Sequence, residues 1–277
     1  MFIHSFSVFL TAPVKDGRVL KDELKRYTEV HFRRVNKFVI LSLIGAHKSV
    51  FGKDLDRRTS IYLTTERGNL GDTENVLHQI YRKQSLPMPY NFINTMSNTA
   101  SFYVSQGLNV EGRNISVSSQ NLSFERGLEL LKADMGMGLV HSALIGGVDE
   151  VNLSEVHFER KYGLTYGSVR QLEGSCWLYI RSEKEGALGE LSAIRSFQSR
   201  EDAMAWLVFE LRLSPTHLAF GMAVREDERK IWKEAVRPNC IYDYVKDHGY
   251  FEGYRLNRDC IEKAAVLLLL LLEANKS

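Results

Sequence analysis

The 277-residue sequence has few cysteines, and they match no common cysteine pattern. Cys176, Cys240 and Cys260 are odd in number and far apart, which fits neither a disulfide framework nor the ligand spacing of a zinc site. Scattered single cysteines are typical of small buried hydrophobic positions in proteins of a reducing compartment. We therefore expect a cytoplasmic protein with no metal and no cofactor.

The sequence also has little excess charge and no long hydrophobic run. Lysine and arginine total 36 against 34 acidic residues, and this formal charge of +2 argues against nucleic acid as the main partner. The longest apolar run, Ala264–Leu272, is far shorter than the ~20 residues that a membrane span needs, so it predicts a buried C-terminal helix. Residues 1–17 lack a basic segment and a cleavage site, so Met1–Thr11 is predicted to be a strand and not a signal peptide.

Residues 115–151 carry the pattern around which the chain is organised. Ile115–Ser119 alternates apolar and small polar residues as a strand does, and a short turn leads into a helix with Leu128 and Leu131 on one face. A second strand, His141–Ile145, is predicted to end at Gly146-Gly147. Strand, tight turn and buried helix is how α/β enzymes present a nucleophile, yet the turn here holds serine, glutamine and asparagine and no cysteine.

Further strands and helices alternate along the rest of the chain. Apolar segments predict strands at Ser60–Thr65, Glu173–Arg181, Glu190–Phe197 and Thr216–Val224. Helical spacing predicts helices at Glu23–Val50, Thr73–Lys83, Asn91–Gly107, Ala203–Leu211 and Glu228–Val236. This alternation indicates an α/β fold with a parallel or mixed sheet covered on both faces.

Several segments, taken in order, resemble the β-ketoacyl synthase family. They are RRVNKFVILSLIGAHKSV (33–50), SIYLTT (60–65), the stretch PYNF…SSQN (89–121), ALIGGVDEV (143–151) and EGSCWLYIRSE (173–183). The resemblance implies a thiolase-like, layered α-β-α-β-α fold. Residues 1–190 would form its N-terminal half and residues 191–277 an abbreviated C-terminal half, in one compact unit.

The catalytic positions of the family are altered in this sequence. Counting back from Gly146-Gly147 puts Asn121 at the nucleophile position, and counting forward from the strand puts Gln120 there. Either residue is a carboxamide, which has no ionisable proton near neutral pH and is a poor nucleophile. Phe220 stands where the first catalytic histidine of the family would be, and His248 is a weak candidate for the second, more in keeping with a loop histidine.

Family members with glutamine at the nucleophile position are chain-length factors, the non-catalytic partners of type II polyketide synthases. The resemblance therefore implies a subunit that pairs with an active ketosynthase, meets the acyl carrier protein through that partner, and shapes the partner's acyl tunnel. The small size is similar to that of the subunits of aryl polyene systems. Candidate tunnel and interface residues are Phe92, Met96, Phe102, Tyr103, Ile115, Val117, Ser119 and Phe124.

Two other functions stay open at this point. One is an acyltransferase or hydrolase that uses Ser118, Ser119 or Ser123 with His141 or His248 as base, although the sequence has no G-x-S-x-G motif. The other is a scaffolding protein of the same fold that handles no acyl chain.

Overall fold

The structure is a computed structural model, and it describes only part of the chain. The described residues are 1–14, 16–96, 98–151, 156–157, 160, 170–206, 217–220, 226–236, 240–242 and 254–256. The predicted Ala264–Leu272 helix and His248 lie outside them. Among the described helices, none is long and apolar enough to cross a membrane.

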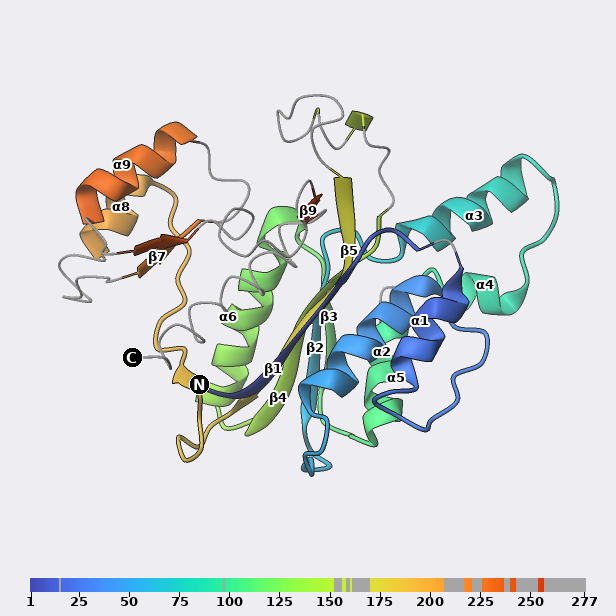
Figure 1. Ribbon diagram of the computed structural model, residues 1–277, viewed down its shortest axis with the longest axis horizontal. Coiled ribbons are helices and arrows are strands. Elements are labelled where there is room, and N and C mark those ends of the chain that lie inside the picture. Colours follow the sequence, from blue (N-terminus) through green and yellow to red (C-terminus); the bar gives the residue numbers. More distant parts are fainter. Residues whose placement is uncertain are drawn as a thin grey trace.

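A mixed seven-stranded sheet forms the centre of the molecule (Figure 1). Its main path runs in the order β3 (Asn114–Val117), β2 (Ser60–Thr64), β4 (Ser142–Asp149), β5 (Arg170–Arg181), β1 (Phe2–Thr11) and β6 (Gly189–Glu190). Strand β2 is parallel to β3 and β4, and β5 is antiparallel to β4 and β1. The seventh strand, β9 (Tyr254–Leu256), pairs with the start of β5, and β3 is left at an edge of the sheet.

Helices cover both faces of this sheet (Figure 1). On one face lie α1 (Gly17–Leu24), α2 (Lys37–Ser49) and α5 (Thr99–Leu108). Helix α2 is apolar all round and buried along nearly its whole length, as expected of a helix enclosed by other elements. On the other face lies α6 (Ser123–Gly136), which buries Phe124, Leu128 and Leu131 against the sheet.

Two glycines let α2, β4 and β5 approach closely around one large side chain. Trp177 on β5 is completely buried. A side chain at Gly45 of α2, or at Gly146 of the neighbouring strand β4, would collide with its indole ring. Gly146 and Gly147 both lie inside β4, and at Gly146 a larger residue would not fit.

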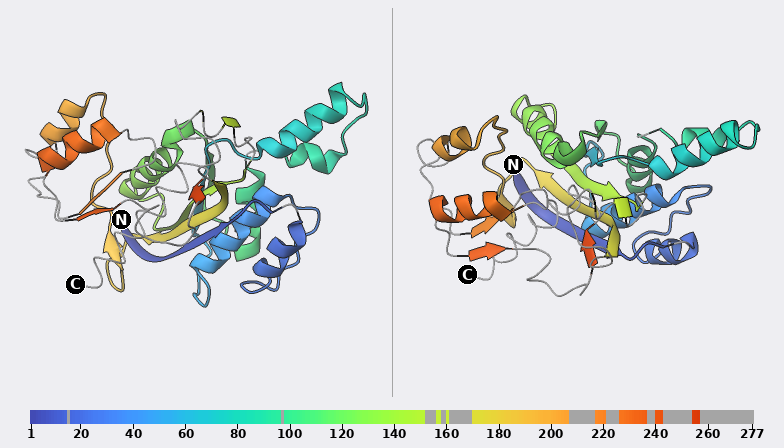
Figure 2. Two further views of the ribbon diagram at one scale, coloured as in Figure 1. Left: turned by 45° about the horizontal axis from the view of Figure 1, so that its top comes forward. Right: turned by 90° about the horizontal axis from the view of Figure 1, so that it is seen from above.

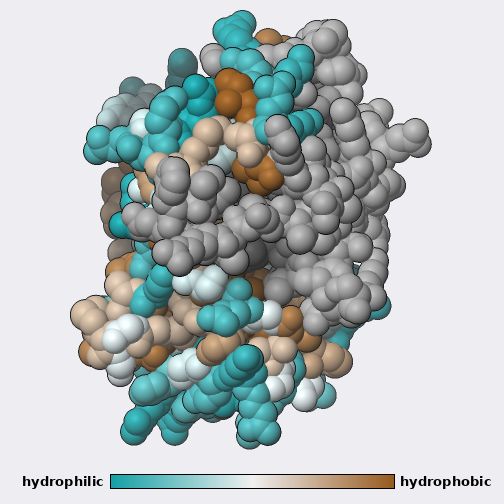
Figure 3. Space-filling model, turned by 90° about the vertical axis from the view of Figure 1, so that its left-hand side faces the viewer, coloured by the Kyte–Doolittle hydropathy of each residue, from teal (hydrophilic) through white to brown (hydrophobic). Residues whose placement is uncertain are grey.

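Smaller parts project from the two ends of the central body. Helices α3 (Leu70–Tyr81) and α4 (Pro89–Ile93) extend outward on the side of α1 and α2 (Figure 2). Helices α8 (Arg200–Ala205) and α9 (Glu226–Val236) lie at the other end, with a two-stranded sheet of β7 (His217–Ala219) and β8 (Cys240–Tyr242). Seen from that end, the described surface mixes hydrophobic residues with hydrophilic ones (Figure 3).

The structure confirms the predicted strands at 60–65 and 173–181 and the helices at 73–83 and 228–236, within a few residues. The single helix predicted over Glu23–Val50 is wrong, because Arg34 has a left-handed backbone (φ 56°) and Asn36 caps a separate α2 by accepting a hydrogen bond from the Val39 N–H. The helix predicted over Asn91–Gly107 is interrupted between Ile93 and Thr99, where threonine hydroxyls bond to backbone carbonyls.

Three further strand and helix predictions are wrong in extent. The second strand of the central stretch does not end at Gly146-Gly147 but continues to Asp149. Of Glu190–Phe197, only Glu190 belongs to a strand, which pairs with the start of β1. The described part of the helix predicted over Ala203–Leu211 begins earlier, at Arg200, where the Ser199 hydroxyl caps it by accepting from the Asp202 N–H.

Candidate functional site

The tight turn between β3 and α6 has the backbone geometry of a nucleophile elbow. Strand β3 ends at Val117, a single 3-10 turn spans Gln120–Leu122, and α6 begins at Ser123. Gln120 has φ 49°, in the left-handed region that residues other than glycine adopt uncommonly. A strained residue between a strand and a buried helix is the arrangement that exposes a nucleophile in α/β enzymes. Here the exposed residue is a glutamine.

Ser123 holds this turn in place. Its hydroxyl donates to the Gln120 carbonyl at 2.7 Å and accepts from the Ser119 N–H at 2.8 Å. One buried side chain therefore bonds to the backbone N–H just before Gln120 and to the carbonyl of Gln120 itself. On the other side of the turn, the Ser118 hydroxyl donates to the Glu66 carbonyl at 3.1 Å, which ties the elbow to the loop after β2.

A network of buried polar groups supports that loop at the carboxyl ends of β2 and β4. The Asp149 carboxylate accepts from the Thr65 hydroxyl at 2.8 Å and from the Glu66 N–H at 3.0 Å. The Thr65 hydroxyl in turn accepts from the Gly68 N–H at 2.9 Å. Carboxyl ends of parallel strands are where ligands bind in open α/β sheets, so the elbow lies at the end of the sheet where a site is expected.

Glu173 joins three segments beneath this edge. Its fully buried carboxylate accepts from the Val14 N–H at 2.9 Å and the Val151 N–H at 3.1 Å, and it forms an ion pair with Lys37 at 2.7 Å. A buried charge needs such compensation. The ion pair therefore fixes the start of α2 relative to the ends of β1 and β4.

Within the described residues, the elbow presents no nucleophile with a base beside it. Gln120 is a carboxamide, which is a poor nucleophile, and no described serine of the turn is hydrogen-bonded to a histidine. Ser118 is bound to a backbone carbonyl and Ser123 is buried, whereas His141 precedes β4, at the opposite end of that strand and roughly 20 Å from the elbow by strand rise. The serine–His141 pair considered from the sequence is therefore not brought together.

The candidate tunnel and interface residues divide into three groups. Phe92, Met96 and Phe102 are exposed by 61%, 49% and 56% of their surface, although all three are large and apolar. Tyr103 is partly buried beside Phe32 and Phe102, Ile115 and Val117 are half-buried on β3, and Ser119 is exposed. Phe124, only 2% exposed, is a core residue between α6 and the sheet, so it does not reach a surface.

The sequence analysis missed further exposed apolar residues on α3, α4 and the loop between them. They are Leu77, Ile80, Tyr81, Leu86, Met88, Tyr90 and Ile93. With Phe92, Met96 and Phe102 they make up a set of large, exposed apolar side chains, here called the apolar surface, on α3, α4, α5 and the segments between them. Helices α3 and α4 project from the central body (Figure 2). A sequence signal for these residues was available. It is the segment between the two predicted helices, which combines prolines with bulky apolar residues.

Phe220, which the family resemblance placed at a histidine position, directly follows β7 and is nearly buried. The guanidinium of Arg229 on α9 lies 5.7 Å from the centre of its ring, a cation–π contact. This is a packing role. Among the described residues, no group of three or more histidine, cysteine, aspartate or glutamate side chains could hold a metal ion.

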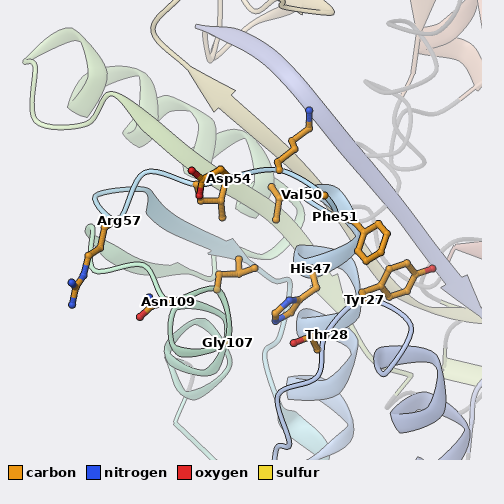
Figure 4. A pocket seen from close by; sticks show the side chains of 13 residues that line it. Tyr27, Thr28, His47, Val50, Phe51, Asp54, Arg57, Gly107 and Asn109 are labelled. Atoms are coloured by element: carbon orange, nitrogen blue, oxygen red, sulfur yellow. The ribbon is translucent and has the colours of Figure 1, made fainter.

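A hollow of about 420 Å³ lies at the opposite end of β2, away from the elbow (Figure 4). Tyr27, His47, Phe51 and Asn109 are among its lining residues. Burial lowers the pKa of His47 to about 4, so the imidazole is neutral at physiological pH. With no second titratable side chain bonded to it among the described contacts, His47 supplies no catalytic pair here.

Comparison with solved structures identifies the fold of the chain, whereas comparison with protein families and curated sequences finds no match. No family model and no curated protein sequence matches the chain. A chain of AntDE:AntF, a type II PKS acyl-carrier protein in complex with its ketosynthase bound to the hexaketide, matches with a TM-score of 0.65 and 13% identity over 98% of this chain and 90% of that one.

Two other solved structures match nearly as well. The ishigamide ketosynthase/chain length factor has a TM-score of 0.59 and 15% identity over 85% of this chain and 80% of that one. A β-ketoacyl synthase from Burkholderia phymatum STM815 has a TM-score of 0.57 and 14% identity over 85% and 78%. The chain therefore has the thiolase-like α/β fold of ketosynthases and chain length factors, as the sequence predicted. At these identities the likeness establishes the fold alone.

Proposed function

We propose that this chain is a non-catalytic, chain-length-factor-like subunit that pairs with an active ketosynthase and shapes its acyl tunnel. The observation that carries the proposal is the elbow itself: a ketosynthase-like fold presents Gln120, a carboxamide, in the strained position between β3 and α6. The polar network and the Ser123 contacts that support a nucleophile turn are present, but the reactive group is absent.

The edge position of β3 supports a partner. Among the described strands, β3 pairs with β2 alone, so its other side presents backbone N–H and C=O groups that another chain can pair with. Helix α5, which carries the exposed Phe102, lies beside β3, because the Asn114 side-chain amide donates to the Ser101 carbonyl at 3.0 Å. Exposed apolar side chains beside an unpaired strand edge fit a protein–protein interface.

The finer parts of the proposal concern the acyl chain. Phe92, Met96 and Phe102 are the residues of the candidate set whose bulk is free to enter a partner's tunnel and limit its length. The substrate would be an acyl chain built from malonyl units on a carrier protein that docks through the ketosynthase, as in cytoplasmic aryl polyene synthesis. The solved ketosynthase/chain length factor and ketosynthase–carrier protein structures support this assignment by fold.

Co-expression with a ketosynthase tests the proposal. We expect the two chains to purify as a heterodimer and to extend a primer from malonyl-carrier protein only when both are present. Activity should survive Gln120→Ala, because the carboxamide performs no chemistry. Activity of the isolated chain that is lost on Ser118→Ala or Ser119→Ala would overturn the proposal in favour of a serine enzyme. Stable monomers with no binding to any tested ketosynthase would favour the scaffolding alternative.

A further inference from the structure

The projecting part formed by residues 70–93, here called the α3–α4 lobe, is attached to the body mainly by polar contacts. The Gly71 N–H donates to the Glu150 carboxylate at 3.2 Å, and Asn36 donates to the Asp72 carboxylate. Apolar attachment is slight, since Val76 is the one buried residue of α3 and α4 has none. Few buried apolar contacts are typical of segments that open locally at low free-energy cost.

Two carboxyl groups lie where the lobe meets the body, Glu150 buried and Asp72 partly exposed. Glu150, at the end of β4, is 6% exposed, and a Cβ atom at Gly71 would lie 3.0 Å from its Oε1, so the helix start presses directly on the carboxyl. Burial raises the pKa of Glu150 to about 7, and burial also raises the pKa of Asp72 on α3. A raised pKa means that the enclosed position favours the protonated form.

Among the described residues, the charged groups that act on Glu150 come from α2, α3 and β5. The Lys37 ammonium on α2 and the Gly71 N–H stabilise the ionised form, whereas the carboxylates of Asp72 on α3 and Glu173 on β5 destabilise it. The Lys37 ammonium is already paired with Glu173 at 2.7 Å. Loss of hydration therefore outweighs the favourable contacts, and the ionised carboxyl is costly as long as the lobe covers it.

We infer that the α3–α4 lobe is a proton-linked flap, which closes on the body when Glu150 takes up a proton and opens when Glu150 ionises. Opening lets water reach the carboxyl, whose pKa then returns toward its ordinary value of 4.5. With a pKa of about 7 closed and 4.5 open, the opening equilibrium rises about tenfold between pH 6 and pH 8. The flap carries much of the apolar surface assigned above to the partner, but the inference holds for the isolated chain.

Hydrogen exchange of the full chain, followed by mass spectrometry at pH 6, 7 and 8, tests this inference. Exchange rates of α3 peptides, divided by the intrinsic rate at each pH, should rise about tenfold from pH 6 to pH 8, while α6 peptides stay constant. In Glu150→Gln, which mimics the protonated carboxyl, the α3 rates should become independent of pH. Glu74→Gln is the matched control, because Glu74 is an exposed carboxyl on the same helix; it should keep the wild-type pH dependence.

Three results would overturn the inference. The first is an exchange rate of α3 in the wild-type chain that, once divided by the intrinsic rate, does not change with pH. This measurement does not depend on the folding of any variant. The second is an undiminished pH dependence in Glu150→Gln. The third is loss of the pH dependence in Glu74→Gln as well, which would assign it to the helix charge in general. Failure to bind a ketosynthase would not affect any of these three exchange measurements. The flap inference and the proposed function can therefore be refuted independently.

Discussion

The hydroxyl of Ser123 and the carbonyl of Gln120 are joined by a hydrogen bond of 2.7 Å across the turn between β3 and α6. The same hydroxyl accepts from the Ser119 N–H, so Ser123→Ala leaves that N–H without its partner and removes one of the two hydrogen bonds of the Gln120 carbonyl, which keeps the backbone N–H of residue 123. We expect a loss of about 1–3 kcal/mol in the free energy of unfolding, measured by urea denaturation. Ser85→Ala, at an exposed serine, is the control and should leave the stability nearly unchanged. Equal stability of both variants would contradict the supporting role.

Two glycines of α6 predict opposite responses to the same substitution. A Cβ atom at Gly127 would collide with the Thr64 methyl group on β2, whereas Gly136 has open space around it. Gly127→Ala should therefore destabilise the protein by about 1–3 kcal/mol, because helix and sheet must move apart. Gly136→Ala should stabilise it by up to about 1 kcal/mol through the higher helix propensity of alanine. Thermal unfolding of both variants measures the difference, and a change of the same sign in both would refute the packing argument.

Removal of one partner from the Lys37–Glu173 ion pair should be costly. Glu173 is completely buried, so Lys37→Met leaves an uncompensated carboxylate, and we expect a loss of about 3–5 kcal/mol in unfolding free energy. Lys25→Met removes an exposed lysine that pairs with exposed Asp22, and its stability should stay close to that of the wild type. Denaturant unfolding at fixed pH compares the two variants directly. Similar losses in both would show that burial of Glu173 is not the cause.

His47 predicts a pH dependence of stability. Burial lowers its pKa from 6.5 to about 4 in the folded protein, so between these values the unfolded chain binds the additional proton. Stability from this group therefore rises as pH increases from about 4 to 6.5, by about 3 kcal/mol in total. Glu150 acts in the opposite sense, because its raised pKa makes stability fall between pH 4.5 and about 7.

A difference measurement separates the two groups. Unfolding free energies of the wild type and of His47→Gln, measured from pH 4.5 to 7.5, should diverge with a slope that ends near pH 6.5. Parallel curves would contradict the structure, in which His47 is a buried and neutral side chain. The same series on Glu150→Gln should diverge in the other direction.

The proposed tunnel role predicts an effect on product length. In a reconstituted heterodimer, Phe102→Ala should permit longer acyl products, because it removes bulk from the apolar surface proposed to face the partner. Phe51→Ala is a matched control, since Phe51 is equally exposed but lies at the hollow beyond the opposite end of β2. Mass spectrometry of carrier-bound products distinguishes them. An unchanged product distribution in Phe102→Ala would remove this residue from the tunnel.

Local sequence patterns were sufficient to predict the central stretch as strand, turn, helix and strand. Its alternating and helical periods arise from which side chains face the core, and α6 does bury Leu128 and Leu131. The same patterns did not show that Gly146 lies within a strand. In the sequence, a glycine pair indicates the end of a strand. The reason for glycine at position 146 is Trp177, which the pairing of β4 with β5 brings opposite it from a distant part of the chain.

The geometry of the candidate site depended on still more distant contacts. Sequence counting allowed either Gln120 or Asn121 at the turn, and only the backbone shows that Gln120 adopts the left-handed conformation. Phe102 and Phe124 looked alike in the sequence, but one is exposed and the other is in the core. Their exposure is set by how α5 and α6 rotate against the sheet, which no local period determines.

The enclosure of Trp177 makes it an optical reporter. Its indole is completely buried where Gly45 of α2 and Gly146 of β4 leave room for it, and the chain has only two other tryptophans, Trp206 and Trp232. In a Trp206→Phe, Trp232→Phe background, the emission spectrum would report on the contact between α2 and the sheet alone. A blue-shifted emission maximum that persists while the α3–α4 lobe opens would show that water does not reach the core around Trp177 during that motion.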